Sequence, residues 1–196
     1  AKEDREKNPY LAYIGMDDYL AGKTAARRAI SSGRIKGRAV VAIQQAGHEG
    51  LEARYRGIKE VLSSHGIITD KLDTTSDPDM IRKIMSQYLE KHKDTDSVFY
   101  LGPLTVHSIS SILRNKRKDL YICGFDISPQ ILEFIKTGVI DFSIDQQPYM
   151  QGYLSVSLLG LKCRNNLKLA DINTGVGIID KTNVHIVESL TTKGIR

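Results

Sequence analysis

The sequence predicts an α/β fold with a doubly wound parallel sheet, and three observations support this prediction. Short apolar runs alternate with helical patterns of about ten to fifteen residues along most of the chain. The runs at 39–43 and 120–125 are apolar throughout, as parallel strands covered on both faces must be. Proline follows a capping residue at 77–78 and again at 128–129, which is typical of a helix start.

Local signals at the ends of the apolar and helical segments give the individual elements. Asp17 or Asp18 caps the first helix and Gly33 closes it, while Gly66 and Gly138 close two later helices. The expected strands are 10–15, 38–45, 67–72, 97–102, 120–126, 139–145, 172–180 and 183–187. The expected helices are 17–33, 51–66, 76–92, 104–115, 128–138 and 149–163.

The strand at 139–145 differs from the central strands. Its apolar side chains stand at 140, 142 and 144, and polar side chains stand between them. Because successive side chains of a strand point to opposite faces, this alternation predicts an edge strand with one solvated face. An edge strand is also a natural place for the chain to leave a domain.

Composition and charge exclude some classes of protein. The chain has 196 residues, 41% of them hydrophobic, which is enough for a buried core, and it contains no apolar run of about twenty residues that would span a membrane. The net charge is +5, but the basic residues are dispersed, and the densest basic runs, 33–38 and 114–118, are expected to be solvated loops that bind no nucleic acid. Cys123 and Cys163 lack the spacing of a zinc or redox motif, so they leave the compartment open.

Polar residues gather in the loops that follow the expected strands. In an open parallel sheet such loops line the ligand crevice. They are Asp17 and Asp18 together with the segments 44–54, 73–77, 102–105, 125–128 and 145–148. Carboxylate, guanidinium and amide groups suit a neutral polyol, because carboxylates accept hydrogen bonds from hydroxyls and arginine donates to them. Phe99, Tyr100 and Tyr149 are the aromatic candidates for stacking on such a ligand.

Each candidate also has a purely structural interpretation. Asp126 could cap the turn into Ser128, Arg54 could be a solvated helix residue, and Gln146 could bond only to backbone. His48 is expected more often as a polar loop residue at the rim than as a base paired with Glu49. The sequence lacks four common motifs: G-x-S-x-G, G-x-G-x-x-G, H-E-x-x-H and the P-loop. We therefore expect no enzymatic activity, no cofactor and no metal site.

Taken together, five segments resemble the type I periplasmic binding proteins, specifically the sugar-binding branch that includes ribose-binding proteins and is related to LacI-type repressor effector domains. These segments are 13–30, 47–62, 98–103, 122–159 and 172–184. The resemblance implies two α/β lobes joined by three crossover strands, with ligand held between the lobes and closure by hinge motion. It also implies that this chain is a C-terminal lobe plus fragments of an N-terminal lobe, most of which is missing.

The resemblance implies roles for particular residues. Arg54 matches an arginine that reaches sugar hydroxyls, Asp126 matches an acid that accepts from them, and Gln146 falls on a ligand-contacting position. Gly102 and Pro103 replace an Asn-Asp pair of the family, which would make room for a larger or modified sugar.

Four further residues complete the predicted site. Asp17 and His48 are predicted to contact ligand, and Asp17, Asp145 and Gln147 are predicted to form hinges. In the intact protein, Arg54→Ala is expected to remove most of the sugar affinity and to leave the fold in place.

The expected organisation has three parts. Residues 1–17 would be a charged lead-in, a strand of the N-terminal lobe and the first hinge. Residues 18–144 would form the C-terminal lobe. Residues 145–196 would supply a hinge, a helix of the N-terminal lobe and a crossover segment. The helix 149–163 carries apolar side chains with nothing to cover them, so a dimer through this helix is one expectation.

Three functions remain open at this stage. The first is an extracytoplasmic solute-binding protein, periplasmic or a cell-surface lipoprotein, that delivers a sugar or polyol to an ABC transporter permease. The second is the effector-binding domain of a LacI-type regulator, which would be cytoplasmic. The third is the sensor domain of a membrane signalling receptor. A signal peptide or lipidated cysteine, a helix-turn-helix, or a transmembrane helix in the full-length protein would distinguish them.

Overall fold

The computed structural model describes residues 10–195, except for the side chains of 110–116. The expected charged lead-in therefore lies almost entirely outside the described residues. The helices are α1 (Asp18–Ser31), α2 (Glu49–Ser64), α3 (Pro78–Lys91), α4 (Pro103–Lys116), α5 (Pro129–Lys136), α6 (Pro148–Asn165) and α7 (Val184–Thr192). The strands are β1 (Ile14–Gly15), β2 (Arg38–Ile43), β3 (Ile68–Asp73), β4 (Thr95–Tyr100), β5 (Tyr121–Phe125), β6 (Phe142–Asp145), β7 (Ile172–Asn173) and β8 (Gly177–Asp180).

Six of these strands form one sheet in the order β3-β2-β4-β5-β6-β8, and all neighbours are parallel except β6 and β8. The chain leaves β2 for β3 on one side and then returns to β4 on the other. The strand order therefore reverses between β2 and β4, where ligands of open α/β sheets bind outside the carboxyl ends of the strands.

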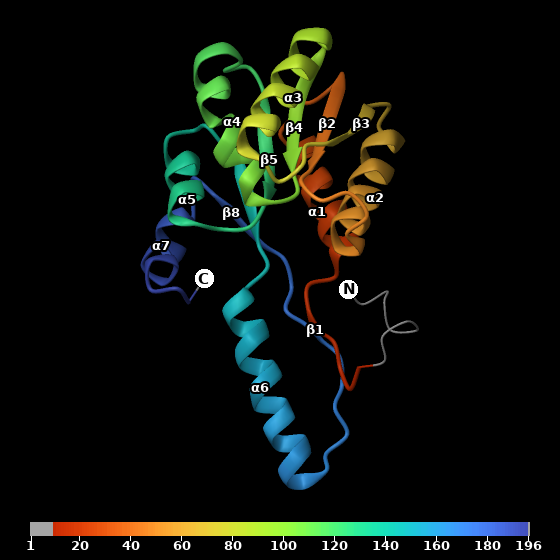
Figure 1. The fold of residues 1–196 in the computed structure, drawn as a ribbon, viewed down its shortest axis with the longest axis vertical. Coiled ribbons are helices and arrows are strands. Elements are labelled where there is room, and N and C mark those ends of the chain that lie inside the picture. Colours follow the sequence, from red (N-terminus) through yellow and green to blue (C-terminus); the bar gives the residue numbers. More distant parts are fainter. Residues whose placement is uncertain (1–9, 196) are drawn as a thin grey trace.

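Helices cover both faces of this sheet, as the sequence predicts. The core on one face joins strand residues such as Val41 and Phe99 to α1 and α2. The core on the other face joins the alternate residues, such as Val40 and Val98, to α3, α4, α5 and α7. The predicted doubly wound α/β fold is confirmed (Figure 1).

The capping residues also act as the sequence predicts. The Asp17 carboxylate accepts from the Leu20 backbone N–H at 3.0 Å, so Asp17 rather than Asp18 caps α1. Ser128 Oγ accepts from the Ile131 N–H at 3.1 Å at the start of α5. Because Asp17 is the cap, the Asp18 carboxylate is not needed to cap α1.

Helices α1 and α2 approach each other closely because glycines lie between them. A Cβ placed on Gly22 would lie 2.1 Å from the Arg54 carbonyl oxygen, and a Cβ on Gly57 would lie 2.2 Å from the Tyr19 carbonyl oxygen. Such distances are far inside van der Waals contact, so only glycine permits this packing. The close approach places Asp18 of α1 against Arg54 of α2.

A second region extends from the sheet. Strands β1 and β7 pair in parallel as a separate two-stranded sheet, and α6 runs beside them (Figure 1). We call α6, β1 and β7 the arm. Helix α6 contains no buried residue. None of the helices within residues 10–195 is both long and apolar enough to cross a membrane.

The prediction of a solvated edge strand at 139–145 is wrong. The strand β6 is buried along its whole length, and it lies between β5 and β8. The polar residues that produced the alternation have internal partners: Ser143 Oγ donates to the Asp126 carbonyl at 2.5 Å, and the Asp145 carboxylate accepts from the Gln147 N–H at 2.8 Å. An alternation of apolar and polar residues therefore occurs both in a strand with one solvated face and in a buried strand whose polar side chains are hydrogen-bonded.

Two predictions near the C-terminus also need correction. The expected strand 172–180 is two short strands in different sheets, β7 and β8, separated by Gly175 at φ 81°. The expected strand 183–187 is part of helix α7, whose Val184 and Val187 complete the core over α5 and β8. A short apolar run does not distinguish strand from helix by periodicity, and packing against α5 selects the helix here.

Candidate functional site

Three polar side chains predicted for the site meet at the carboxyl ends of the strands. Arg54 comes from α2, Asp126 follows β5, and Gln146 follows β6. Gln146 joins the other two, since its Oε1 accepts from Arg54 Nη2 at 3.1 Å and its Nε2 donates to the Asp126 carboxylate. We call these three residues the polar cluster.

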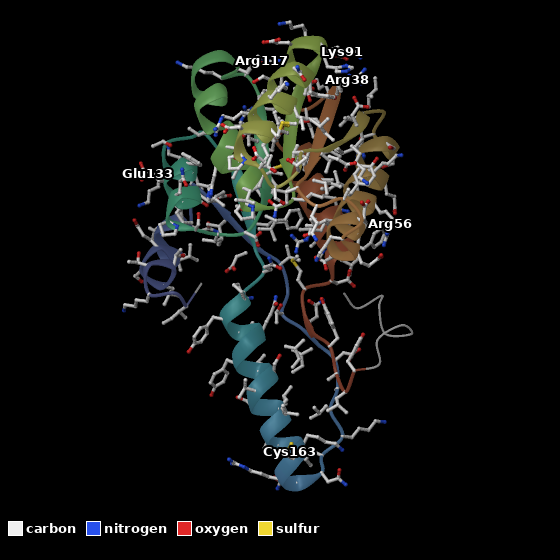
Figure 2. The ribbon with its side chains drawn as sticks, viewed as in Figure 1. Arg38, Arg56, Lys91, Arg117, Glu133 and Cys163 are labelled. Atoms are coloured by element: carbon white, nitrogen blue, oxygen red, sulfur yellow. The ribbon has the colours of Figure 1, made fainter. Side chains whose placement is uncertain are left out.

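Arg54 is buried, with 7% of the residue exposed, and every nitrogen of its guanidinium has a partner. Its Nε donates to Asp18 Oδ1 at 2.7 Å, and its Nη1 donates to the Leu101 carbonyl at 3.2 Å. The guanidinium also lies over the Phe125 ring, 4.5 Å from its centroid. These contacts fix the orientation of Arg54 before any ligand arrives, so the alternative of a solvated helix residue is wrong. Arg56, by contrast, lies on the outer side of α2 (Figure 2).

Asp126 combines a half-buried carboxylate with an unusual backbone. Its φ is 74°, in the left-handed region that residues other than glycine seldom adopt. Its N–H still donates to the Ile144 carbonyl at 2.9 Å, which ties the turn to β6. Burial raises the pKa of Asp126, while Arg54 and the bond from Gln146 act in the opposite direction. A strained, partly desolvated acid beside a fixed cation is typical of binding sites.

The segment after β6 links the cluster to the arm. Asp145 is buried, and Gln147 has φ 57°, so the backbone turns sharply before Pro148 opens α6. The Gln147 side-chain amide donates to the Thr174 carbonyl at 2.8 Å, and Thr174 Oγ1 donates to the Gln146 carbonyl at 3.3 Å. The residues before α6 and the residues after β7 are thus bonded to each other.

A cavity of about 200 Å³ opens beside the cluster. It is lined by Asp126, Ile127, Asp145, Gln146 and Pro148. The walls offer carboxylate and amide groups together with apolar atoms, a combination that suits a small polar molecule. Within the described part of the chain, His, Cys, Asp and Glu side chains do not gather in any group of three or more that would hold a metal ion.

Other predicted site residues lie outside the cluster's hydrogen bonds. Asp17 caps α1, and His48 caps α2 by accepting from the Leu51 N–H at 3.4 Å. Gly102 follows Leu101, whose carbonyl bonds Arg54. Their predicted contact with ligand remains a prediction.

The aromatic candidates need correction. Phe99 and Tyr100 are completely buried in the two cores, on opposite faces of the sheet, and cannot stack on a ligand. Tyr149 is exposed on α6. The ring that does contact the cluster is Phe125, which lies under Arg54.

Sequence reasoning missed the role of Asp18. It treated the Asp17-Asp18 pair as a helix start, yet only Asp17 is the cap, and Asp18 is 9% exposed and holds Arg54. A signal was available: residue 18 stands three and four positions before the buried Ala21 and Gly22, so it shares their helical face. An acid on an apolar face requires a partner.

Comparison with known proteins assigns the chain to a family. The periplasmic binding protein domain family matches residues 3–166, so the chain belongs to that family. The chain is also 26% identical over 185 residues to a xylose/arabinose-binding protein of Sulfolobus acidocaldarius, which covers 91% of this chain and 46% of that protein.

Solved structures agree with this assignment. A periplasmic sugar-binding protein of an ABC sugar transporter from Legionella pneumophila superimposes with a TM-score of 0.83 and 32% identity, covering 88% of this chain and 65% of that one. A carbohydrate transporter from Acidothermus cellulolyticus, in complex with myo-inositol, superimposes with a TM-score of 0.90 and 26% identity, covering 100% of this chain and 68% of that one. The chain thus spans about half to two thirds of the length of these relatives.

Proposed function

We propose that this protein binds a neutral polyol, a sugar or a cyclitol, and delivers it to the permease of an ABC transporter. The single observation that carries the proposal is the polar cluster of Arg54, Asp126 and Gln146 at the carboxyl edge of the sheet. A carboxylate accepts from two adjacent hydroxyls, a guanidinium donates to ring and hydroxyl oxygens, and an amide does both. The cluster can therefore both accept hydrogen bonds from the hydroxyls of a polyol and donate to them.

The proposed division of the chain follows from the position of this cluster. Residues 18–144 would form one wall of the binding cleft, to which β8 and α7 also belong. The rest of residues 145–196 would carry a hinge and part of the opposite wall. Asp17, Asp145 and Gln147 would be hinge residues, supported at Gln147 by its left-handed backbone and its bond to Thr174. Hinges are often a few residues at the ends of elements, as here.

Relatives of the chain support the class of ligand. One relative is a xylose/arabinose-binding protein, and another was solved in complex with myo-inositol. All three ligands are neutral polyhydroxylated molecules of similar size. By the same likeness we expect the protein outside the cytoplasm, in the periplasm or as a cell-surface lipoprotein. We expect binding without turnover. The side chains of the cluster are hydrogen-bonded to one another, and none of the described residues there is an activated nucleophile.

An association of two chains through α6 belongs to the same proposal. A groove of about 460 Å³ runs along this helix, lined by Pro148, Tyr149, Gly152, Tyr153, Val156 and Ser157. Tyr153 and Val156 are 63% and 75% exposed. Exposed apolar surface of this kind favours contact with a second copy of the chain.

The experiment that tests the function is a thermal-shift screen of the full-length protein. The panel is D-xylose, L-arabinose, D-ribose, D-glucose, D-galactose and myo-inositol. A ligand that binds the folded state at one hundred times its Kd stabilises it by about 2.7 kcal/mol, so a binder should raise Tm by several degrees. Calorimetry then gives the affinity of each hit.

A matched pair of variants locates the binding. Gln146→Met keeps the size of the side chain and removes both cluster bonds, and it should reduce affinity about tenfold or more. Gln130→Met makes the same change at an exposed position on α5 and should bind as the wild type does. Equal affinity in the two variants would remove the cluster from the site. Turnover of any panel member would overturn the transport function itself.

A further inference from the structure

One side chain beside the polar cluster has no role in it. Gln44 is the first residue after β2, and Gly102 comes two residues after the end of the neighbouring strand β4. The Leu101 N–H donates to the Ala42 carbonyl at 3.1 Å, so the two strands remain joined up to this point. Gln44 and Gly102 therefore stand on either side of the gap where the strand order reverses, which is the usual ligand position in such sheets.

The Gln44 amide occupies the space above Gly102. A Cβ on Gly102 would lie 2.5 Å from Cδ and Oε1 of Gln44 and 2.6 Å from its Nε2. The φ of Gly102 is −157°, an extended conformation open to any residue, so its backbone does not require glycine. A larger residue at position 102 would therefore have to displace the Gln44 amide, which fills the space that glycine leaves.

The Gln44 side-chain oxygen also lacks a hydrogen-bond partner among the described residues. This atom, Oε1, is buried, and no donor among the residues with described side chains bonds it. The backbone of Gln44 is held, because its carbonyl accepts from Ser76 Oγ at 3.2 Å. Buried amide oxygens are nearly always bonded, so an anchored glutamine with an unbonded amide needs an explanation. The residue as a whole is only half-buried, so part of its side chain can be reached from outside.

The Gln44 amide lies close to the groups that would hold the ligand. Arg54 Nη1 bonds the carbonyl of Leu101, the residue directly before Gly102. The amide and the guanidinium thus flank the same two-residue stretch of backbone. A polyol bonded by Arg54 would therefore lie near the Gln44 amide.

We propose that Gln44 is a specificity-determining residue of the cleft, whose amide, seated over Gly102, hydrogen-bonds a hydroxyl of the bound polyol. This inference rests on the proposed function and adds a fourth polar side chain to the three of the cluster. Since no bond from the described protein must break, the amide gains a partner when ligand binds. A site that bonds a particular hydroxyl rejects the analogue that lacks it, because its own polar group is then left unpaired.

The test is calorimetry on the full-length protein with D-xylose, L-arabinose, myo-inositol and their monodeoxy derivatives. Gln44→Met preserves the length of the side chain and removes its hydrogen bonds, and it should lower affinity for the parent polyol about tenfold. Gln45→Met makes the same change at the adjacent, exposed position and should alter affinity less than about twofold. One deoxy derivative should bind weakly to the wild type and lose little further affinity in Gln44→Met.

A second variant perturbs the Gln44 amide without changing Gln44 itself. Gly102→Ala places a Cβ where the Gln44 amide lies and should displace it, so it should lose affinity to a similar extent even if Gln44→Met were to fold poorly. Urea unfolding without ligand reports the integrity of each variant.

The outcomes separate the two claims. Wild-type affinity in both Gln44→Met and Gly102→Ala would make Gln44 a packing residue and overturn this inference alone. Failure of the wild type to bind any of the three polyols would overturn the proposed function and this inference with it.

Discussion

The lobe, which is the six-stranded sheet with the helices that cover it, differs from the arm in how its helices are buried. Helix α2 buries eight residues against the sheet and α1, while α6, which is longer, buries none. Each helix has a local start signal, since His48 caps α2 and Pro148 stands in the first turn of α6. Local signals therefore define both helices, but only α2 has a buried face. Since tertiary packing supplies most of the stability of a helix in a protein, α6 should be the less stable of the two.

The same difference separates the charged residues. In the lobe, Arg54 and Asp18 form a buried ion pair whose side chains are 8% and 11% exposed. On the arm, Lys162 reaches Asn166 across one exposed turn at 2.8 Å. If one residue of a buried ion pair is replaced, the other charge stays buried with neither a partner nor water. If one residue of an exposed pair is replaced, water solvates the charge that remains.

Arg54→Met should lower the free energy of unfolding by about 3–5 kcal/mol, because Asp18 would remain buried without its partner. The expectation from sequence that Arg54→Ala leaves the fold in place stays a prediction, which the same measurement on that variant tests. Arg164→Met, at an exposed position on α6, should change stability by less than about 0.5 kcal/mol. Urea unfolding of both variants measures the difference. The double variant Asp18→Asn with Arg54→Met should recover part of the loss, and no recovery would argue against the pair.

Gly57→Ala should destabilise by about 1–3 kcal/mol or more, because its Cβ would lie 2.2 Å from the Tyr19 carbonyl and push α1 from α2. The same change on the arm should have the opposite sign. Gly152→Ala has no atom within 4 Å of its new Cβ and should stabilise α6 by about 0.5–1 kcal/mol. Thermal unfolding followed by circular dichroism compares them. Equal shifts in Tm would contradict the close approach of α1 and α2.

Asp126→Asn should stabilise the protein near neutral pH and weaken polyol binding. Burial raises the pKa of Asp126 in the folded state, so the protonated form is favoured there. Its stabilising contribution is complete below the unfolded pKa of about 4 and is lost as the pH rises through the folded pKa. The asparagine variant should therefore lose that part of the pH dependence. Urea midpoints from pH 3.5 to pH 7 test this, and a variant that is less stable than the wild type at pH 7 would contradict it.

Val156→Ser should have the smallest effect on stability, less than about 0.5 kcal/mol, because Val156 is 75% exposed. It should reduce self-association of this chain at high concentration if two copies meet through α6. Sedimentation velocity of the variant and the wild type measures this, with Ser155→Ala on an exposed neighbouring position as control. Identical sedimentation at all concentrations would remove α6 from any contact between copies.

Where the prediction of the fold from sequence succeeded, it used short-range signals. The all-apolar runs at β2 and β5 and the proline starts of α3 and α5 gave the alternation of strand and helix, and hence the parallel sheet. It failed at 139–145 and 183–187, where a pattern of a few residues allows two structures. At both places the outcome depended on β8 and α7, which pack against β6 and α5 from far along the chain.

The candidate site divides in the same way. The sequence by itself placed Arg54, Asp126 and Gln146 in loops or helices at one edge of the sheet, because parallel strands bring their carboxyl ends together. It did not reveal that Asp18 holds Arg54, a pair 36 residues apart, or that Gln146 reaches across 92 residues to the same guanidinium.

Tertiary structure alone also decided that the Gln44 amide lies over Gly102 and that Phe99 and Tyr100 lie inside the cores. Capping, periodicity and turn chemistry act over a few residues and can be seen in the sequence. The meeting of side chains depends on strand order and on the close approach of α1 and α2, which only the packed chain determines.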